Sequence, residues 1–168
     1  NPKNPTDAGN AIRLIKLFGS DIRYVYEFKK WIHWDGSRWL FDEDGYMFRL
    51  AKETARSISQ EAANETDESR RRTLLQHALR SENKQQLDSM IQVAKTEEGI
   101  TISQSQLDQD KYLLGVANGV VNLRTGGLLD NCKESMITKR TGTAFNQNDK
   151  CPLWLNFINE ITNNNKEL

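Results

Sequence analysis

Residues 31–41 read WIHWDGSRWLF, two short aromatic runs on either side of the triplet at 35–37. Asp-Gly between β-prone runs is typical of a hairpin, because glycine accepts the positive φ that tight turns require. Just before this segment, Ile22, Tyr24 and Tyr26 alternate with other residues, as in a strand with one covered face. The sequence therefore predicts a small antiparallel sheet in this region.

Helical periodicity dominates the segments on both sides of this sheet. Thr6 and Asp7 can cap a first helix that ends at Gly19. After a polar break at residues 42–45, apolar residues recur at helical spacing in successive blocks, which predicts amphipathic helices that pack on one another. The three blocks are Leu50–Ala62, Leu74–Leu79 and Leu87–Ala94. Residues 64–67 form a polar break between the first two, and Ser81 can cap the third.

The last third of the chain returns to short strands and ends in a helix. Residues 97–110 are polar and predict a loop with a short helical turn near Ser105–Gln109. Pro152 suits the first turn of the final helix, where its missing N–H removes no helical hydrogen bond. Strands are predicted near Tyr112–Leu114 and Gly119–Leu123. A turn then leads into Leu128–Leu129, and a further strand is predicted near Thr138–Phe145.

These elements together predict an α+β fold. A central helical bundle is flanked by small antiparallel β-hairpins, with helices at both ends of the chain. We expect a single domain over residues 1–168. Within it, residues 1–44 hold the first helix and the aromatic hairpin, 45–96 the helical bundle, and 111–168 the later strands and the last helix.

Composition narrows the classes of protein that fit. Lys plus Arg and Asp plus Glu both number 23, so the formal net charge is zero. This balance argues against a protein that coats DNA through bulk positive charge, although a local basic face stays possible. The chain has no apolar run of roughly 18 residues, so no membrane span is expected, and we expect a cytoplasmic protein.

No catalytic or metal-binding motif stands out in the chain. A phosphate-binding loop of the form Gly-x-x-x-x-Gly-Lys-Ser/Thr is absent from the sequence, so we expect no ATP hydrolysis by this segment itself. Asp42, Glu43 and Asp44 form an acidic cluster that could suggest a metal site, and we interpret it as a solvated turn. Cys132 and Cys151 stand apart, without the paired spacing of a zinc site. We predict neither catalytic residues nor metal ligands here.

Basic residues near the aromatic hairpin and on the helices are candidates for contacts with DNA. Aromatic rings can stack unpaired bases while lysine and arginine meet the phosphates. The alternative is that the rings fill the core of the sheet, and that Arg70–Arg72 pair with the nearby acidic residues Glu65, Asp67 and Glu68. The candidate DNA-binding residues are Arg38, Lys52, Arg56, Arg70, Arg71, Arg72, Lys139 and Arg140.

An ordered series of segments resembles the domain that precedes the superfamily 3 helicase module in phage, plasmid and poxvirus primase-helicases. The resemblance extends over nearly the whole chain, with the middle helices matching in pattern only. The matching segments are Thr6–Leu14, Asp21–Val25, Trp31–Trp39, Leu50–Thr54, Asn118–Gly126, Ile137–Lys139 and Cys151–Trp154.

The resemblance implies a protein of DNA replication that a phage or prophage encodes. It implies that the chain is a segment of a longer protein with a hexameric, ATP- and Mg-dependent helicase and, in some members, a primase. In that setting this segment is a non-catalytic collar or linker that supports self-association into a hexamer and handles DNA. The alternative is a module that binds single-stranded or origin DNA through the aromatic hairpin and the basic helix face.

Overall fold

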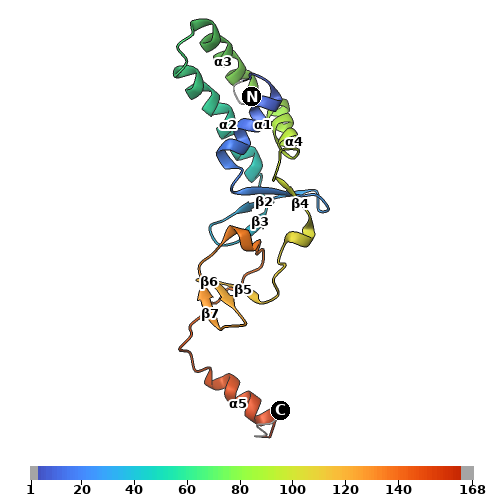
Figure 1. The fold of residues 1–168 in the computed structure, drawn as a ribbon, viewed down its shortest axis with the longest axis vertical. Helices are drawn as coiled ribbons and strands as arrows, with labels where there is room; N and C mark the ends of the chain where they lie inside the picture. The colour runs from blue at the N-terminus through green and yellow to red at the C-terminus, as the bar shows by residue number, and fades with distance from the viewer. Residues whose placement is uncertain (1–3, 164–168) are drawn as a thin grey trace.

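The computed structural model describes residues 4–163, and its helices and strands follow one another along a single long axis (Figure 1). A layer of helices lies at one end, the first sheet lies below it, and a second, smaller sheet and an isolated helix follow. The elements are α1 Asp7–Phe18, β1 Ile22–Val25, β2 Lys30–Trp34, β3 Trp39–Phe41, α2 Tyr46–Ala63, α3 Glu68–Ser81, α4 Lys84–Ala94, β4 Thr101–Ile102, the short 3-10 helix η1 Gln104–Gln106, β5 Leu113–Val116, β6 Gly119–Asn122, β7 Gly127–Leu129, η2 Lys133–Ser135 and α5 Pro152–Ile161.

The helical layer forms because each of its helices has an apolar stripe that another helix covers. Thr6 caps α1, with its hydroxyl accepting a hydrogen bond from the backbone N–H of Gly9 at 3.1 Å. Helix α1 then packs on α4 and α2, and α3 packs on the second half of α2. The core between α1, α2, α4 and the first sheet includes Ala11, Leu14, Ile22, Tyr24, Trp31, Met47, Ala51, Leu87, Met90 and Ile100.

The first sheet has the strand order β3-β2-β1-β4. Strands β1, β2 and β3 are antiparallel neighbours, and β4 adds a short parallel pairing with β1. Tyr24 lies opposite Trp31, and both face the helices. Because side chains alternate along a strand, the neighbouring residues Val25 and Ile32 face the other way, where they form a second buried cluster with Trp39.

Loops from the last third of the chain cover this second face. The indole N–H of Trp39 donates to the backbone oxygen of Lys133 at 2.9 Å, and its backbone N–H donates to the oxygen of Ile137 at 2.8 Å. Leu107 and Met136 pack against the same cluster. The sheet is therefore covered on both faces, by the helices on one side and by loops from a distant part of the sequence on the other.

The second sheet is an antiparallel meander of β5, β6 and β7. Gly119 starts β6 with φ 151°, and a Cβ there would lie 2.4 Å from the backbone oxygen of Leu129. Only glycine permits that close approach of β6 to β7. An isolated parallel bridge joins Gly115 to Arg140, which ties the later loop to this sheet.

The structure confirms the α+β class and most of the predicted elements, and it corrects several details. Ser81 is not the cap of α4; it is the buried last residue of α3, and Asn83 precedes α4 instead. The strand predicted at Thr138–Phe145 is wrong, because this segment makes only the bridge at Arg140. Strand β4 was missed, since two residues are too few to show alternation.

Two boundaries of the fold also differ from the expectation. Tyr26 lies beyond the end of β1 and is 70% exposed, so it is no part of the covered face. Helix α2 begins at Tyr46, earlier than its apolar pattern showed, because the carboxylate of Asp42 accepts hydrogen bonds from the N–H groups of Tyr46 and Met47 at 2.7 and 2.9 Å. The division at residues 1–44, 45–96 and 111–168 stays a prediction.

Candidate nucleic-acid interface

The basic residues predicted to contact DNA fall into separate regions of the fold. Lys52 and Arg56 lie exposed on α2, and residues 70–72 lie at the start of α3. Arg38, Lys139 and Arg140 come together beside the first sheet instead, as the contacts below show. The structure therefore offers no single surface that joins all of these residues, and each region has to be judged by itself.

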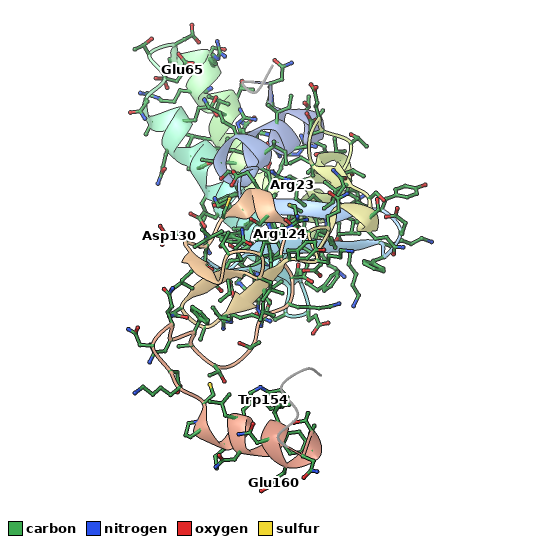
Figure 2. All side chains as sticks on the ribbon, turned by 60° about the horizontal axis from the view of Figure 1, so that its bottom comes forward. Arg23, Glu65, Arg124, Asp130, Trp154 and Glu160 are labelled. Atoms are coloured by element: carbon green, nitrogen blue, oxygen red, sulfur yellow. The ribbon has the colours of Figure 1, made fainter. Side chains whose placement is uncertain are left out.

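The arginines at the start of α3 are engaged with acidic neighbours. Arg70 Nε lies 3.1 Å from a carboxylate oxygen of Glu65, and Arg71 pairs with Glu68. Figure 2 shows Glu65 at the far end of the α2–α3 pair, at the opposite end of the molecule from Trp154. The pairing with acidic neighbours is confirmed for these two arginines, so a phosphate would have to displace a carboxylate at each of them.

Arg38 and Arg140 surround the turn between β2 and β3. Arg140 donates to the hydroxyl of Ser37 at 2.8 Å, and Arg38 Nε lies 3.9 Å from a carboxylate oxygen of Asp35. Burial opposes ionisation of Asp35, but hydrogen bonds from Arg38 and Ser37 and the charge of Arg140 together hold the pKa of Asp35 below its usual value. The turn thus carries Arg38 and is held by Arg140, which comes from the loop after η2.

The tryptophans of the hairpin belong to the core. Trp31 is 7% exposed and Trp39 is 1% exposed, and the ring of Trp34 packs edge-on against Trp39. His33 stacks on Tyr46 with ring centroids 3.9 Å apart. These rings therefore stabilise the sheet and its contact with α2. Trp31 and Trp39 offer no face to a ligand, whereas Trp34 is partly buried.

Two phenylalanines at the end of the hairpin behave differently. Phe28, in the β1–β2 turn, is 47% exposed, and its ring packs edge-on against Phe41 with centroids 5.7 Å apart. With Lys30 they line a surface hollow of about 300 Å³, which we call the Phe28–Phe41 hollow. An adjoining hollow of about 490 Å³ shares both phenylalanines and extends over Gln104, Ser105, Leu107, Asp108, Thr138 and Lys139.

Two acidic residues fasten the walls of these hollows together. The carboxylate of Glu27 accepts hydrogen bonds from the Ser103 hydroxyl at 2.7 Å and from the Gln104 N–H at 2.9 Å. The carboxylate of Asp108 accepts from the N–H and hydroxyl of Thr138 at 2.7 and 2.6 Å. The hydrogen bond from Ser103, aided by that from Gln104, lowers the pKa of Glu27, so this contact persists in weakly acidic solution.

The acidic and thiol groups that could suggest a metal site are engaged in structural contacts or stand alone. Asp42 caps α2, Glu43 lies 3.7 Å from Lys30 Nζ, and Asp44 lies 2.9 Å from Arg49. Within residues 4–163, no three His, Cys, Asp or Glu side chains are grouped so that they could hold a metal ion. Cys132 and Cys151 are both exposed and free. Over the same range, no helix has the length and apolar character needed to cross a bilayer.

Comparison with known proteins gives the family. The family model described as D5 N terminal like matches residues 11–163. The chain belongs to this family. Its members are the N-terminal region of D5-like phage and plasmid primase-helicases, which confirms the resemblance found from the sequence. A search of curated proteins finds no match to the chain.

In this D5 N terminal-like domain, the sequence analysis did not identify Phe28, or the carboxylates of Glu27 and Asp108 that connect the segments around the hollows. The turn at residues 26–30 reads YEFKK, an aromatic residue between charges. An exposed phenylalanine in such a turn is unusual, and that was the one signal available. Glu27 and Asp108 gave no signal, because their partners lie 76 and 30 positions away in the chain.

Proposed function

We propose that this domain is a non-catalytic assembly and linker part of a phage-type replicative primase-helicase in the cytoplasm. It supports formation of the hexamer and handles DNA, while ATP and Mg²⁺ serve a helicase module elsewhere in the same protein. Membership of the D5 N terminal-like family supports the setting. The observation that carries the assembly role is the exposed apolar surface of α5.

Helix α5 has an amphipathic sequence but no buried residue. Its exposed apolar side chains include Leu153 at 85%, Trp154 at 59% and Phe157 at 50% exposure. Figure 2 shows Trp154 on a helix set apart from the rest of the described chain. Contiguous exposed apolar residues of this size mark interaction surfaces in proteins. We assign this surface to contact with the helicase module of the parent protein.

The charge pattern of the domain suits contact with protein as well as with DNA. The formal net charge of the chain is zero, and several surface arginines pair with acidic neighbours, as at Arg49–Asp44 and Arg70–Glu65. A surface without a strong single-sign field favours specific contacts over general attraction to phosphate. This is the pattern expected of a collar whose main partners are other subunits.

The test uses the full-length parent protein. Deleting this domain should abolish or weaken the hexamer in sedimentation measurements and reduce DNA unwinding. Within the domain, Trp154→Asp should weaken assembly by placing a charge on the apolar side of α5. Leu79→Asp, on α3 at 74% exposure, is the matched control and should leave assembly intact. A parent that forms normal hexamers and unwinds DNA without this domain would refute the assembly role.

A second candidate function is a DNA-binding module. The specific observation in its favour is that Lys30 and Lys139 line adjoining hollows with the exposed Phe28 and the partly buried Phe41. Salt-dependent binding of labelled DNA by the 168-residue chain separates this function from pure assembly. A chain that assembles in the parent but binds no DNA at low salt would remove it.

A further inference from the structure

We propose that the Phe28–Phe41 hollow binds an unpaired base of single-stranded DNA, and that Lys30 and Lys139 contact the phosphates on either side of it. This inference rests on the DNA-handling part of the proposed function and assigns it a site. It keeps Lys139 from the candidate residues of the sequence analysis, and it places the aromatic surface at Phe28 and Phe41 in place of the tryptophans.

The aromatic surface has the form that base stacking needs. Phe28 and Phe41 meet edge-on, so the two rings form a corner whose sides are set at 72° to each other. A base can lie flat on one ring while its edge meets the other. The volume of about 300 Å³ is at the small end of ligand sites, and suits one ring system better than a helix or a strand.

The charged groups around the corner favour phosphate. Lys30 Nζ lies 5.7 Å from the centre of the Phe41 ring, and its ion pair with Glu43 is loose at 3.7 Å between exposed groups. None of the ion pairs found among residues 4–163 involves Lys139. Exposed pairs of this length contribute little, so a phosphate can replace Glu43 as the partner of Lys30.

The carboxylates of Glu27 and Asp108, in the segments that form the hollows, are engaged in hydrogen bonds. Glu27 accepts its hydrogen bonds from Ser103 and Gln104, and Asp108 accepts both of its hydrogen bonds from Thr138. The contacts of Glu27 hold the β1–β2 turn against η1. Those of Asp108 hold the loop after η1 against Thr138, which precedes Lys139. The site is therefore formed before any ligand arrives, which lowers the ordering cost of binding.

Single-stranded DNA fits this site better than duplex DNA or a protein segment. A stacked, paired base cannot reach a ring set in a hollow, whereas an unpaired base has both faces free. A protein segment inserted here would bury Lys30 and Lys139, and would itself have to supply an acidic side chain for each of them. Lys30 in this hollow and Lys139 in the adjoining one instead supply the positive charges that the phosphates of a single strand need.

The test measures fluorescence anisotropy of labelled oligothymidine with the 168-residue chain at low salt. Phe28→Leu keeps the apolar volume but removes the ring face, and should weaken binding about fivefold or more. Phe28→Tyr keeps the ring and should restore binding. Lys30→Ala and Lys139→Ala should each reduce the slope of log K against log salt by about 0.7 for each phosphate that the variant no longer neutralises.

Matched controls and fold checks keep the outcomes distinct. Leu79→Ala and Lys84→Ala change exposed apolar and basic residues on other elements and should bind as the unaltered chain does. Equal thermal midpoints for all variants exclude unfolding as the cause. Unchanged binding by Phe28→Leu, or equal affinity for duplex and single strands, would overturn the site. A parent that still assembles while this chain binds no oligonucleotide would overturn the site alone and leave the assembly role standing.

Discussion

Asn10 Nδ2 donates a hydrogen bond to the hydroxyl of Ser81 at 2.9 Å, and both residues are fully buried between α1 and α3. Asn10 Oδ1 accepts from His77 Nε2 at 2.9 Å on the other side. A buried amide that satisfies both its donor and its acceptor fixes how two helices meet, because any slip would leave a polar group without a partner. The contact links α1 to α3, although β1, β2, β3 and α2 lie between these two helices in the sequence.

Asn10→Ala should therefore destabilise the domain. The change leaves the Ser81 hydroxyl without the donor that now bonds to it and removes the acceptor of His77, at a cost of about 1–3 kcal/mol in the free energy of unfolding. Urea denaturation followed by circular dichroism measures this change. Asn64→Ala, which removes an exposed side-chain hydrogen bond to Gln60, is the control and should alter stability by under about 0.5 kcal/mol. Equal effects of the two substitutions would contradict a special role for the buried contact.

His77 should make the stability of this contact depend on pH. Partial burial, with the charge of Arg13 as a further cause, lowers the pKa of His77 below its usual 6.5. The unfolded chain therefore takes up a proton at higher pH than the folded chain does. Stability is fully present above the unfolded pKa and falls as pH drops through that value toward the folded one.

The measurement is the urea midpoint at several pH values between about 5 and 7.5, above the range in which most carboxylates titrate. The unaltered chain should lose stability toward the acid end, and His77→Gln should show a smaller loss because it removes the titrating group. A steeper loss in His77→Gln than in the unaltered chain would show that the direction is wrong.

The ion pair between α1 and α2 gives a separate prediction. Arg13 Nε and a second guanidinium nitrogen donate to the two carboxylate oxygens of Glu61 at 2.8 and 3.3 Å, and the Arg13 side chain is only 6% exposed. Glu61→Gln leaves a buried cation with a neutral partner, and should lower the free energy of unfolding by about 2–3 kcal/mol. Glu68→Gln, in the exposed pair with Arg71, should change it by less than about 1 kcal/mol.

How far the sequence predicted this fold depended on whether a signal was local. The hairpin at residues 31–41 was predicted with its turn, because aromatic runs around Asp-Gly are a short-range pattern. Helix α1 was predicted with its cap at Thr6. Strand β4 and the hydrogen bond between Ser103 and Glu27 were not predicted, because both depend on which distant segments meet.

The candidate site shows the same limit more sharply. Sequence reasoning pointed to aromatic and basic residues around the hairpin, but it could not separate the buried Trp39 from the exposed Phe28, because both are large aromatic residues near the same hairpin. The pairing of Arg70 with Glu65 was an alternative that the nearby acidic residues suggested, whereas the place of Lys139 in a hollow with Phe28 and Phe41 depends on tertiary structure. Periodicity indicates which face of an element is apolar, but not which loop will cover that face.

The contact of the second sheet with the loop that carries Lys139 can be tested at one glycine. A Cβ on Gly115 would lie 2.5 Å from the backbone oxygen of Lys139, and the Thr141 N–H donates to the Gly115 oxygen at 2.9 Å. Gly115→Ala should push this loop away and cost about 1–3 kcal/mol, measured by thermal or urea unfolding. Gly142→Ala is the matched control, because nothing lies within 4 Å of its Cβ position. If Gly115→Ala were as stable as the control, the close packing of the loop on β5 would be disproved.

The isolation of α5 predicts how its backbone exchanges hydrogen with solvent. A helix spanning only Pro152–Ile161, with no buried residue, has little beyond its own hydrogen bonds to stabilise it. In dilute solutions of this chain, its amides should exchange within about tenfold of the rate of an unstructured peptide. Amides of α2 near Ala55 and Ile58, which are fully buried, should be protected by several orders of magnitude and serve as the internal control.

The dependence of this exchange on protein concentration then identifies what covers α5. If α5 binds a second copy of the chain, its protection should rise with concentration, because association orders and buries the helix by mass action. If it docks on the helicase module of the parent, as proposed, protection should stay low at every concentration of the 168-residue chain and appear only in the parent protein. Strong protection of α5 in the dilute chain alone would contradict both, since it would require a partner surface within the chain that residues 4–163 do not provide in this structure.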